Sequence, residues 1–363
     1  MNVIHAPAEL KAGPRPVCLA IGLFDGVHLG HQQVIRQAVG DAAQHGGISV
    51  VITFDRHPAA VLAPAHVPPL IYPPAKKMRV IAALGPDTAC VIHFDKAFSE
   101  KTGEEFIGGL ARDCRKLQSL SVGRAFAFGR GRSGNVALLN ALGKELNFAV
   151  HALAEVSLDG QAVSSTRVRA AVRAGRFAQA AQMLGRPYTL CGRIIKGSGV
   201  GSGMGVPTAN LELAGLLAPP TGVYAARAFV RGRSYVAAVN IGCRPTVAGV
   251  GPAMQGEARR SAAVIDRRYT SVGPANKGEA DHLGGAAAPP YHSVAAPIQV
   301  EAHLLDFAGD IYGEEVELAF LKKLREEEKY ASLAALGDQI QRDIAQAREL
   351  GGDSPTGTKS DGP

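Results

Sequence analysis

The 363-residue sequence contains no apolar stretch approaching the roughly 20 residues that span a bilayer. Residues 1–16 lack the apolar core of a signal peptide. The cysteines are odd in number and scattered, and no two form a Cys-x-x-Cys pair, which argues against a metal site or a disulfide framework. We therefore expect a soluble cytoplasmic protein with buried free thiols and no membrane partner.

The sequence also lacks a concentrated charge of either sign. Its net charge of +7 is dispersed along the chain, and no RRM, helix-turn-helix or zinc pattern accompanies it. Small anionic substrates explain a mild basic surplus as well as nucleic acid does. We expect no nucleic-acid partner, and the length favours two domains.

Apolar runs alternate with helical patterns through the first half of the chain. The runs predict strands over 17–21, 48–54, 89–94, 120–123 and 148–153, with helices over 32–44, 75–84, 104–114 and 136–142. Alternation of this kind predicts an α/β domain with a doubly wound parallel sheet. Ligands bind such sheets at the carboxyl ends of the strands.

Residues 22–31 read Gly-Leu-Phe-Asp-Gly-Val-His-Leu-Gly-His, between the first strand and the first helix. They combine turn-permitting glycines with two imidazoles, His28 and His31. Free amides and the helix dipole favour a phosphate at a helix N-terminus, and imidazoles can stabilise charge that develops as a phosphoryl bond breaks. The pattern therefore predicts a phosphate-handling turn. The plainer alternative for a lone histidine is an exposed polar side chain without a functional role.

Residues 163–169, Val-Ser-Ser-Thr-Arg-Val-Arg, place hydroxyls and guanidiniums at the start of a helical run. Helix capping alone would explain the serines and the threonine. Near the histidine turn, the same string offers a second set of groups for a phosphate clamp.

From about residue 186 the pattern changes to short alternating runs punctuated by Gly and Pro. Strands are predicted over 188–195, 223–230, 235–241, 299–305 and 315–319, followed by a helix with apolar positions from Leu333 to Ala347. Such runs favour a small β barrel or a sandwich. A glycine-rich run over 196–210 suits a polyphosphate, although Gly-Lys-Ser/Thr is missing and it is therefore no Walker A loop. A flexible linker is the alternative explanation for this run.

Several of these strings resemble motifs of the bacterial bifunctional riboflavin kinase/FAD synthetase family. The histidine turn resembles the HxGH signature of nucleotidyltransferases, and residues 163–169 resemble the family's Ile-Ser-Ser-Thr-Arg-Ile-Arg. Residues 205–210, Gly-Val-Pro-Thr-Ala-Asn, are similar to the Gly-Phe-Pro-Thr-Ala-Asn of riboflavin kinases. Further similar strings are Thr53–Pro58, Asn240–Thr246, Val300–Asp306 and segments of 324–333. The resemblance implies a nucleotidyltransferase-like domain followed by a Greek-key β-barrel kinase domain with a C-terminal helix.

The resemblance also implies two activities, riboflavin to FMN in the barrel and FMN to FAD in the first half, with ATP as co-substrate and Mg²⁺ as cofactor. It implies Glu301 as the kinase base and His28 and His31 as the transferase catalytic pair. The implied ATP-binding residues are Gly22, Phe24, Asp25, Gly26, Gly30, Ser164, Ser165, Thr166, Arg167, Gly199, Gly201, Gly203, Gly205 and Pro207. The implied flavin-binding residues are Phe54, His57, Phe126, Phe128, Arg325, Glu328 and Tyr330, and Thr208 and Asn210 are the implied metal ligands.

One stretch departs from the family pattern. Ala125 stands where the family usually has Asp or Asn, and a methyl group forms no hydrogen bond to a nucleotide. A riboflavin kinase with a weak or inactive transferase half therefore stays open, as does a non-catalytic flavin or nucleotide sensor. The oligomeric state is also open.

We expect the transferase domain over 1–183, the kinase domain over 184–350 and a disordered tail over 351–363. A long stretch rich in Ala, Gly and Pro replaces a short family connection within the kinase domain. Its composition predicts a disordered insert over 248–297.

Overall fold

The computed structural model describes residues 1–196, 206–213, 215–242 and 298–352. Four glycines expected to bind ATP lie outside these residues, namely Gly199, Gly201, Gly203 and Gly205. Cys243, the expected insert over 248–297 and residues 353–363 of the expected tail also lie outside them.

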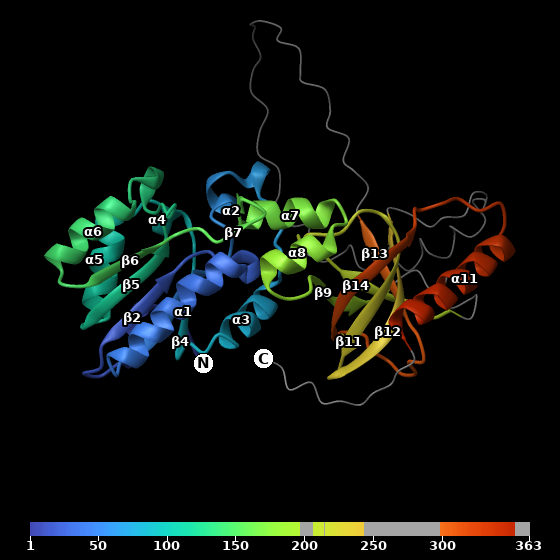
Figure 1. The fold of residues 1–363 in the computed structure, drawn as a ribbon, viewed down its shortest axis with the longest axis horizontal. Helices are drawn as coiled ribbons and strands as arrows, with labels where there is room; N and C mark the ends of the chain where they lie inside the picture. Colours follow the sequence, from blue (N-terminus) through green and yellow to red (C-terminus); the bar gives the residue numbers. More distant parts are fainter. Residues whose placement is uncertain (197–205, 214, 243–297, 353–363) are drawn as a thin grey trace, which may run out of the picture.

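The first half forms a six-stranded parallel sheet in the order β1-β4-β3-β2-β5-β6 (Figure 1). Its strands are β1 (Asn2–Ile4), β2 (Val17–Ile21), β3 (Ile48–Phe54), β4 (Thr88–Ile92), β5 (Leu117–Gly123) and β6 (Ala149–Leu153). From β2 the chain proceeds outward through β3 and β4, and then returns to the other side of β2 as β5. The strand order therefore reverses between β2 and β5, and ligands of open parallel sheets bind at the carboxyl ends of strands at such a point.

Helices cover both faces of this sheet, and its central strands β2, β3 and β5 are largely buried. The helices of this half are α1 (Leu29–Gln44), α2 (Ala59–Leu62), α3 (Pro74–Ala82), α4 (Lys96–Ser99), α5 (Gly103–Asp113) and α6 (Val136–Glu145), with the 3-10 turns η1 (Pro7–Glu9), η2 (Asp25–Val27), η3 (Pro64–His66) and η4 (Arg130–Arg132). In β2, Leu19 packs in one cluster with Ile107 of α5 and Leu139 of α6, whereas Ala20 packs in another with Ile35 of α1. Alternate residues of a strand point to opposite faces, and each face is covered here.

A hairpin and two helices connect the sheet to the second half. They are β7 (Ser157–Leu158), β8 (Gln161–Ala162), α7 (Ser165–Arg173) and α8 (Phe177–Leu184). Figure 1 shows α7 and α8 between the sheet and the barrel. Val168 of α7 and Met183 of α8 belong to a buried cluster that also contains Leu190 and Val316 of the barrel. The connecting helices and the second half therefore share one continuous core.

The second half is a closed antiparallel barrel in the order β10-β13-β12-β11-β14-β9. Its strands are β9 (Thr189–Ile195), β10 (Ala209–Glu212), β11 (Gly222–Val230), β12 (Arg233–Gly242), β13 (Gln299–Leu304) and β14 (Glu315–Arg325). Three consecutive antiparallel strands, β11 to β13, with β14 returning beside β11, make a Greek key. Helix α11 (Leu333–Gly351) lies across the barrel, where Ala347 packs with Ala225 and Val236.

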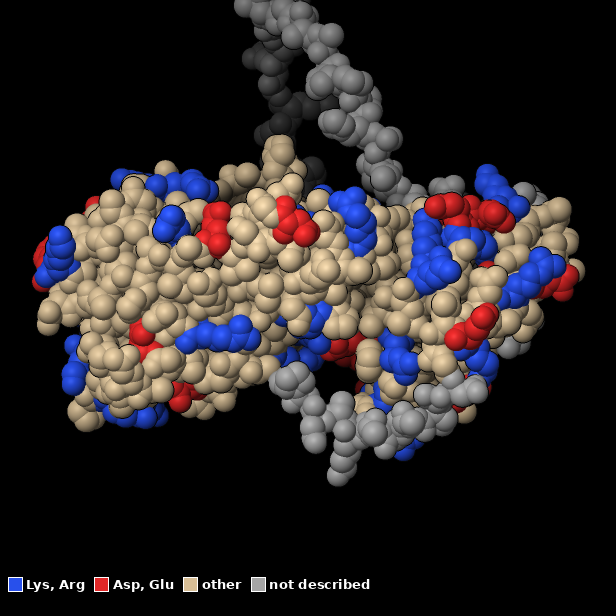
Figure 2. Space-filling model, viewed as in Figure 1, with Lys and Arg blue, Asp and Glu red and all other residues tan. Residues whose placement is uncertain are grey.

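The expected fold class is confirmed, with the Greek-key barrel favoured over a sandwich. Strands β2 and β3 have the predicted bounds, whereas β1 and β10 were not predicted and α11 continues to Gly351. Within the described residues, Cys18, Cys90, Cys114 and Cys191 are buried free thiols, and no helix has the length and apolar character needed to span a membrane. Figure 2 shows basic and acidic side chains interspersed over one face of the molecule, in agreement with a dispersed charge.

Candidate active sites

The histidine turn follows β2 at the carboxyl edge of the sheet, beside the reversal of strand order. Three of its residues have positive φ angles: Phe24 at 52°, Gly26 at 75° and Val27 at 42°. Glycine adopts such angles readily, but a β-branched valine does so only against a steric penalty. Backbone strain of this kind persists where the surrounding structure holds it, and it is typical of functional sites.

Side chains from several elements hold the carbonyl groups of this turn. Leu23 accepts a hydrogen bond from Thr53 Oγ1 (3.0 Å), Asp25 accepts one from Ser165 Oγ (3.0 Å), Val27 accepts from Gln32 Nε2 and Arg186 Nη1 (3.0 Å each), and Gly26 accepts from Arg186 Nη2. With its carbonyls bound to the protein in this way, the turn is fixed in a single strained conformation.

His28 and His31 are brought together at the N-terminus of α1. His28 is the N-cap residue, and its Nδ1 accepts a hydrogen bond from the backbone N–H of His31 (3.4 Å). The two rings stack with centroids 3.6 Å apart, and the ring of Phe24 meets His31 edge-on at 5.3 Å. Gly30 leaves room for this arrangement, because a Cβ there would lie 3.3 Å from Cε1 of His28. The predicted pair therefore shares one site.

Burial determines the charge of both imidazoles. It lowers the pKa of His28 to about 4, and the nearby charge of Arg186 acts in the same direction. It lowers the pKa of His31 well below its ordinary value, with His28 and Lys77 adding to the effect. Both rings are thus neutral at neutral pH and can donate an N–H. A phosphate beside them would raise both pKa values, since an opposite charge favours the protonated form.

Asp25 connects the turn to α7 through a buried ion pair. Asp25 is 3% exposed and Arg169 is 7% exposed, and their side chains are in direct contact. The carboxylate also accepts a hydrogen bond from the Ile71 N–H (3.0 Å), and Arg169 Nε donates to the Pro69 carbonyl (2.8 Å). Burial raises the pKa of Asp25, and the charge of Arg169 opposes that rise. The Asp25 carboxylate is therefore bound by Arg169 and the Ile71 N–H inside the protein.

Residues at the start of α7 contact the histidine turn, as expected for Ser165. Of the two arginines, however, Arg169 contacts the turn and Arg167 contacts the β7–β8 hairpin. Ser164 caps the helix by accepting from the Arg167 N–H (3.2 Å), Ser165 binds the turn as described above, and Thr166 is exposed. Arg167 Nη1 donates to the carbonyls of Leu158 (2.9 Å) and Gln161 (2.8 Å) in the β7–β8 hairpin. Arg169, which the sequence did not single out, makes the contact to the turn.

A small cavity beside the turn is lined by Phe54 and His57, two of the expected flavin residues, together with Lys77 of α3. Lys77 is buried, and its Nζ donates to the Phe54 carbonyl (2.9 Å) and to Thr53 Oγ1 (3.2 Å). Burial lowers the pKa of Lys77 to about 8. Sequence reasoning missed this lysine because it belongs to an ordinary amphipathic helix.

A row of phenylalanine rings connects the remaining expected flavin residues of the first half to Phe54. Neighbouring centroids lie 5.3–6.3 Å apart along Phe126, Phe128, Phe106, Phe98 and Phe54. Offset and edge-to-face aromatic pairs at such distances form a continuous apolar cluster, in which Phe128 belongs to the buried core and the other four rings are partly buried. Ala125 is exposed at the end of β5 next to this row and offers no polar side chain there.

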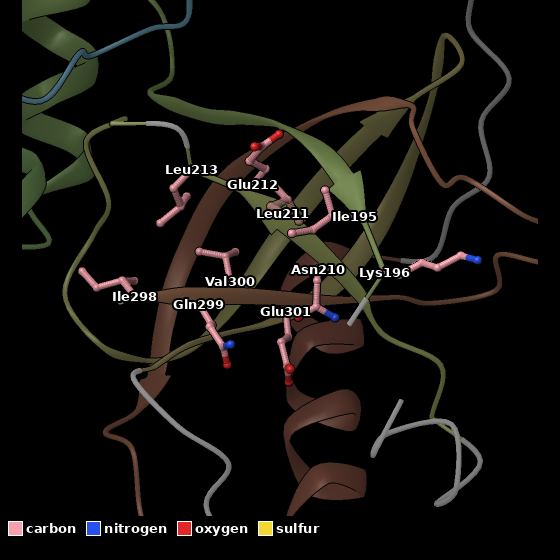
Figure 3. Close-up of a pocket in the computed structure, with 10 residues that line it drawn as sticks. All are labelled: Ile195, Lys196, Asn210, Leu211, Glu212, Leu213, Ile298, Gln299, Val300 and Glu301. Carbon is pink, nitrogen blue, oxygen red and sulfur yellow. The ribbon is translucent and has the colours of Figure 1, made fainter. Parts of the chain in front are cut away.

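The barrel brings Asn210 and Glu301 together. Asn210 of β10 pairs directly with Glu301 of β13, and both line a cavity of about 330 Å³. Figure 3 shows the side chains of Asn210, Gln299 and Glu301 pointing to the same side, with Val300 pointing the opposite way. Thr208 is two residues before Asn210 and half-buried. The predicted base and one predicted metal ligand thus share a cavity.

Glu301 is a half-buried carboxyl that forms no ion pair with any of the described residues. Burial raises the pKa of Glu301 above its ordinary value. A carboxylate with a raised pKa is a stronger proton acceptor. The segment preceding β10 is fixed beside it, because the Pro207 carbonyl lies 2.8 Å from Nδ1 of His303 on β13.

The expected flavin residues of the second half lie together at the end of β14 and directly after it. The Arg325 guanidinium lies 5.6 Å from the centroid of the Tyr330 ring, and the Tyr330 hydroxyl donates to Glu328 (3.2 Å). Asp343 of α11, which is 3% exposed, holds Arg325 through contacts of 2.8–3.1 Å. The sequence did not identify Asp343, since its role depends on how α11 packs against the barrel.

Thr208 and Asn210 offer the oxygen donors that Mg²⁺ prefers. Within the described residues, no three His, Cys, Asp or Glu side chains are grouped in a way that would hold a metal ion. Mg²⁺ ordinarily takes one or two protein ligands and completes its shell with water and nucleotide phosphates. The donor set therefore fits a magnesium–nucleotide complex rather than a metal enclosed by protein.

Comparison with known proteins covers both halves of the chain. A FAD synthetase family model matches residues 10–167, and a riboflavin kinase family model matches residues 184–258 and 281–351. The unmatched residues 259–280 lie inside the expected insert.

Relatives that are described as bifunctional enzymes match nearly the whole chain. A bifunctional riboflavin kinase/FMN adenylyltransferase of Pseudomonas fluorescens is 33% identical over 96% of this chain and 98% of its own length. The protein of the same description from Escherichia coli K12 is 31% identical over 97% of this chain and 98% of its own length. The one from Bacillus subtilis is 28% identical, covering 96% of each chain.

A solved structure shows the same fold. It is described as a macrolide-efflux protein from Streptococcus pneumoniae, and it superposes with a TM-score of 0.71 at 24% identity, covering 96% of this chain and 99% of that one. Its similarity concerns the fold alone. Because the relatives from P. fluorescens and E. coli match both halves over nearly the whole length, the chain belongs to the bifunctional riboflavin kinase/FMN adenylyltransferase family.

Proposed function

We propose that this chain phosphorylates riboflavin to FMN in its barrel and adenylylates FMN to FAD at its histidine turn, using ATP in both reactions. The observation that carries the proposal is that each half keeps its set of reactive side chains together: Asn210 beside Glu301, and His28 stacked on His31. We place the transferase domain at 1–183 and the kinase domain at 184–350, which the matched regions support.

In the kinase reaction, Glu301 accepts the proton of the riboflavin hydroxyl as that oxygen attacks the γ-phosphate of ATP, and ADP leaves. The raised pKa of Glu301 favours this proton transfer, and its side chain faces the cavity next to Asn210. Thr208 and Asn210 would hold Mg²⁺, which spreads the phosphate charge when bound. Arg325, Glu328 and Tyr330 are proposed to bind the flavin.

In the transferase reaction, an FMN phosphate oxygen attacks the α-phosphate of ATP and pyrophosphate leaves. The imidazole N–H groups of His28 and His31 would donate to the α-phosphate oxygens as negative charge develops on them. No protein nucleophile is required, because positioning of the two substrates in line supplies the catalysis. We propose that Gly22, Phe24, Gly26, Gly30, Ser164 and Thr166 border the ATP, and that Phe54, His57, Phe126 and Phe128 border the flavin.

Asp25, Ser165 and Arg167 are proposed to act on ATP indirectly. Their polar side-chain groups are bound to Arg169, to the turn and to the hairpin, respectively. They would therefore shape the phosphate site by fixing the turn and the start of α7.

A matched pair of variants tests whether each site catalyses only one of the two reactions. Glu301→Gln should lower FMN formation from riboflavin by roughly 10²–10⁴ while FAD formation from supplied FMN continues, and His28→Asn should lower FAD formation while FMN formation continues. Glu349→Gln, at an exposed position on α11, is the control. The proposal fails if either variant affects both reactions equally, or if the unmodified protein forms neither product.

Ala125 favours a second candidate, a riboflavin kinase whose transferase half is weak. Position 125 itself, directly before Phe126, offers no polar side chain to the substrates. FMN formation without FAD formation or pyrophosphate release from supplied FMN and ATP would favour this candidate over the bifunctional enzyme.

A further inference from the structure

Arg186 lies where the two halves of the chain meet. It follows α8, precedes β9, and falls within the region matched by the riboflavin kinase model. Its guanidinium nevertheless reaches the histidine turn, where Nη1 donates to the Val27 carbonyl (3.0 Å) and Nη2 donates to the Gly26 carbonyl. A further bond from Nη1 to the Leu184 carbonyl (2.9 Å) fixes the group to the end of α8.

These two carbonyls control the orientation of His28. The Val27 carbonyl belongs to the peptide unit that joins Val27 to His28, and a peptide unit is planar. A hydrogen bond to that oxygen therefore fixes the orientation of the peptide plane that carries the N–H of His28. Val27 holds a positive φ of 42° at this point, so the unit would relax if it were not held.

Arg186 is itself held by residues of the shared core. Its guanidinium lies 5.2 Å from the centroid of the buried Tyr72 ring, and Tyr72 stacks with Tyr188 at 6.3 Å. Tyr188, directly before β9, donates a hydrogen bond to the Leu217 carbonyl of the barrel side. The position of the guanidinium therefore depends on packing between the two halves.

We infer that Arg186 is a positioning residue for adenylyl transfer, so that the kinase half of the chain completes the transferase site. The inference rests on the proposed transferase function of the histidine turn. Planar guanidinium donors can bind two adjacent carbonyls at once, which an ammonium group does less well. Gln32 supports the Val27 carbonyl from the other side, so that loss of Arg186 should loosen the turn without unfolding it.

The test compares Arg186→Met and Arg186→Lys with Arg173→Met, which alters an exposed arginine at the end of α7. Each full-length variant is assayed for FMN formation from riboflavin and for FAD formation from supplied FMN. We expect Arg186→Met to lower the kcat of FAD formation by about tenfold to a hundredfold, the usual effect of a misplaced catalytic group. The KM for ATP should change less, FMN formation should stay within about twofold, and Arg186→Lys should be intermediate.

Two results would overturn the inference. One is an unchanged kcat for FAD formation in Arg186→Met. The other is an equal fall of both activities in Arg186→Lys, which would assign Arg186 to the shared core alone. If Arg186→Met loses both activities through misfolding, Arg186→Lys decides, and a fall confined to FAD formation supports the inference. Absence of FAD formation by the unmodified protein would refute the proposed function itself, and is thereby distinguished from failure of this inference.

Discussion

The buried pair of Asp25 and Arg169 offers a quantitative test of how the histidine turn is held. Asp25→Asn keeps an acceptor for the Ile71 N–H but leaves the guanidinium of Arg169 buried without an anion. Removing one partner of a buried ion pair typically costs ~3–5 kcal/mol of the free energy of unfolding. Arginine keeps its charge at any accessible pH, so Arg169 cannot reduce this cost by losing a proton.

Arg169→Met should cost less, because the remaining carboxyl can take up a proton. Burial already raises the pKa of Asp25, and loss of the arginine would raise it further. A buried polar group left without its partner costs ~1–3 kcal/mol. A carboxyl whose pKa is higher in the folded state destabilises the protein as pH rises above the unfolded value. The Arg169→Met penalty should therefore shrink toward acid pH.

Urea denaturation followed by far-UV circular dichroism measures these penalties, since the chain has no tryptophan to report by fluorescence. The double variant Asp25→Asn/Arg169→Met should cost less than the sum of the single variants, because it leaves no buried charge. Riboflavin phosphorylation against urea serves as a control for the barrel. Additive single penalties, or a cost below about 1 kcal/mol for Asp25→Asn, would refute the assignment of this pair as the link between the turn and α7.

Four further predictions concern the reactions. Glu301→Gln should lower the kcat of riboflavin phosphorylation by roughly 10²–10⁴ without loss of stability at neutral pH, because burial already disfavours the charged carboxylate; rates and urea midpoints check both parts. In the unmodified protein the kinase kcat/KM should fall as pH drops through the raised pKa of Glu301, which a pH–rate profile measures. Asn210→Ala should raise the Mg²⁺ concentration needed for half-maximal kinase rate by about tenfold, with the Mg²⁺ dependence of FAD formation as the unaffected reference. Ala125→Asn should raise the kcat of FAD formation about fivefold if a new hydrogen bond forms to the bound substrates, and an unchanged rate would contradict this reasoning.

The central strands of the parallel sheet could be predicted because burial on both faces is visible in each strand's own residues. Strands β2 and β3 are covered on both faces, which makes them predominantly apolar runs with clear ends. Strand β10 has four residues after a glycine-rich run, too few for a period-2 pattern to stand out. It was missed although it carries Asn210, which motif resemblance alone identified.

The supporting residues of the sites were harder to predict than the reactive ones. Ser165 and Arg169 are four residues apart and therefore share one face of α7, a signal that could have pointed to Arg169 rather than Arg167. Lys77, Arg186 and Asp343 carry no such signal, because their partners lie far away in sequence and depend on how helices pack. Sequence reasoning therefore found the groups expected to touch substrate and missed those that hold them.

The most direct test of the central claim is a time course of the flavins formed from riboflavin, ATP and Mg²⁺ by the full chain, separated by chromatography with pyrophosphate measured in parallel. The two-site account predicts that FMN appears first, and that FAD follows with one pyrophosphate released for each FAD. FMN that accumulates without FAD, or riboflavin that stays unphosphorylated, would contradict it.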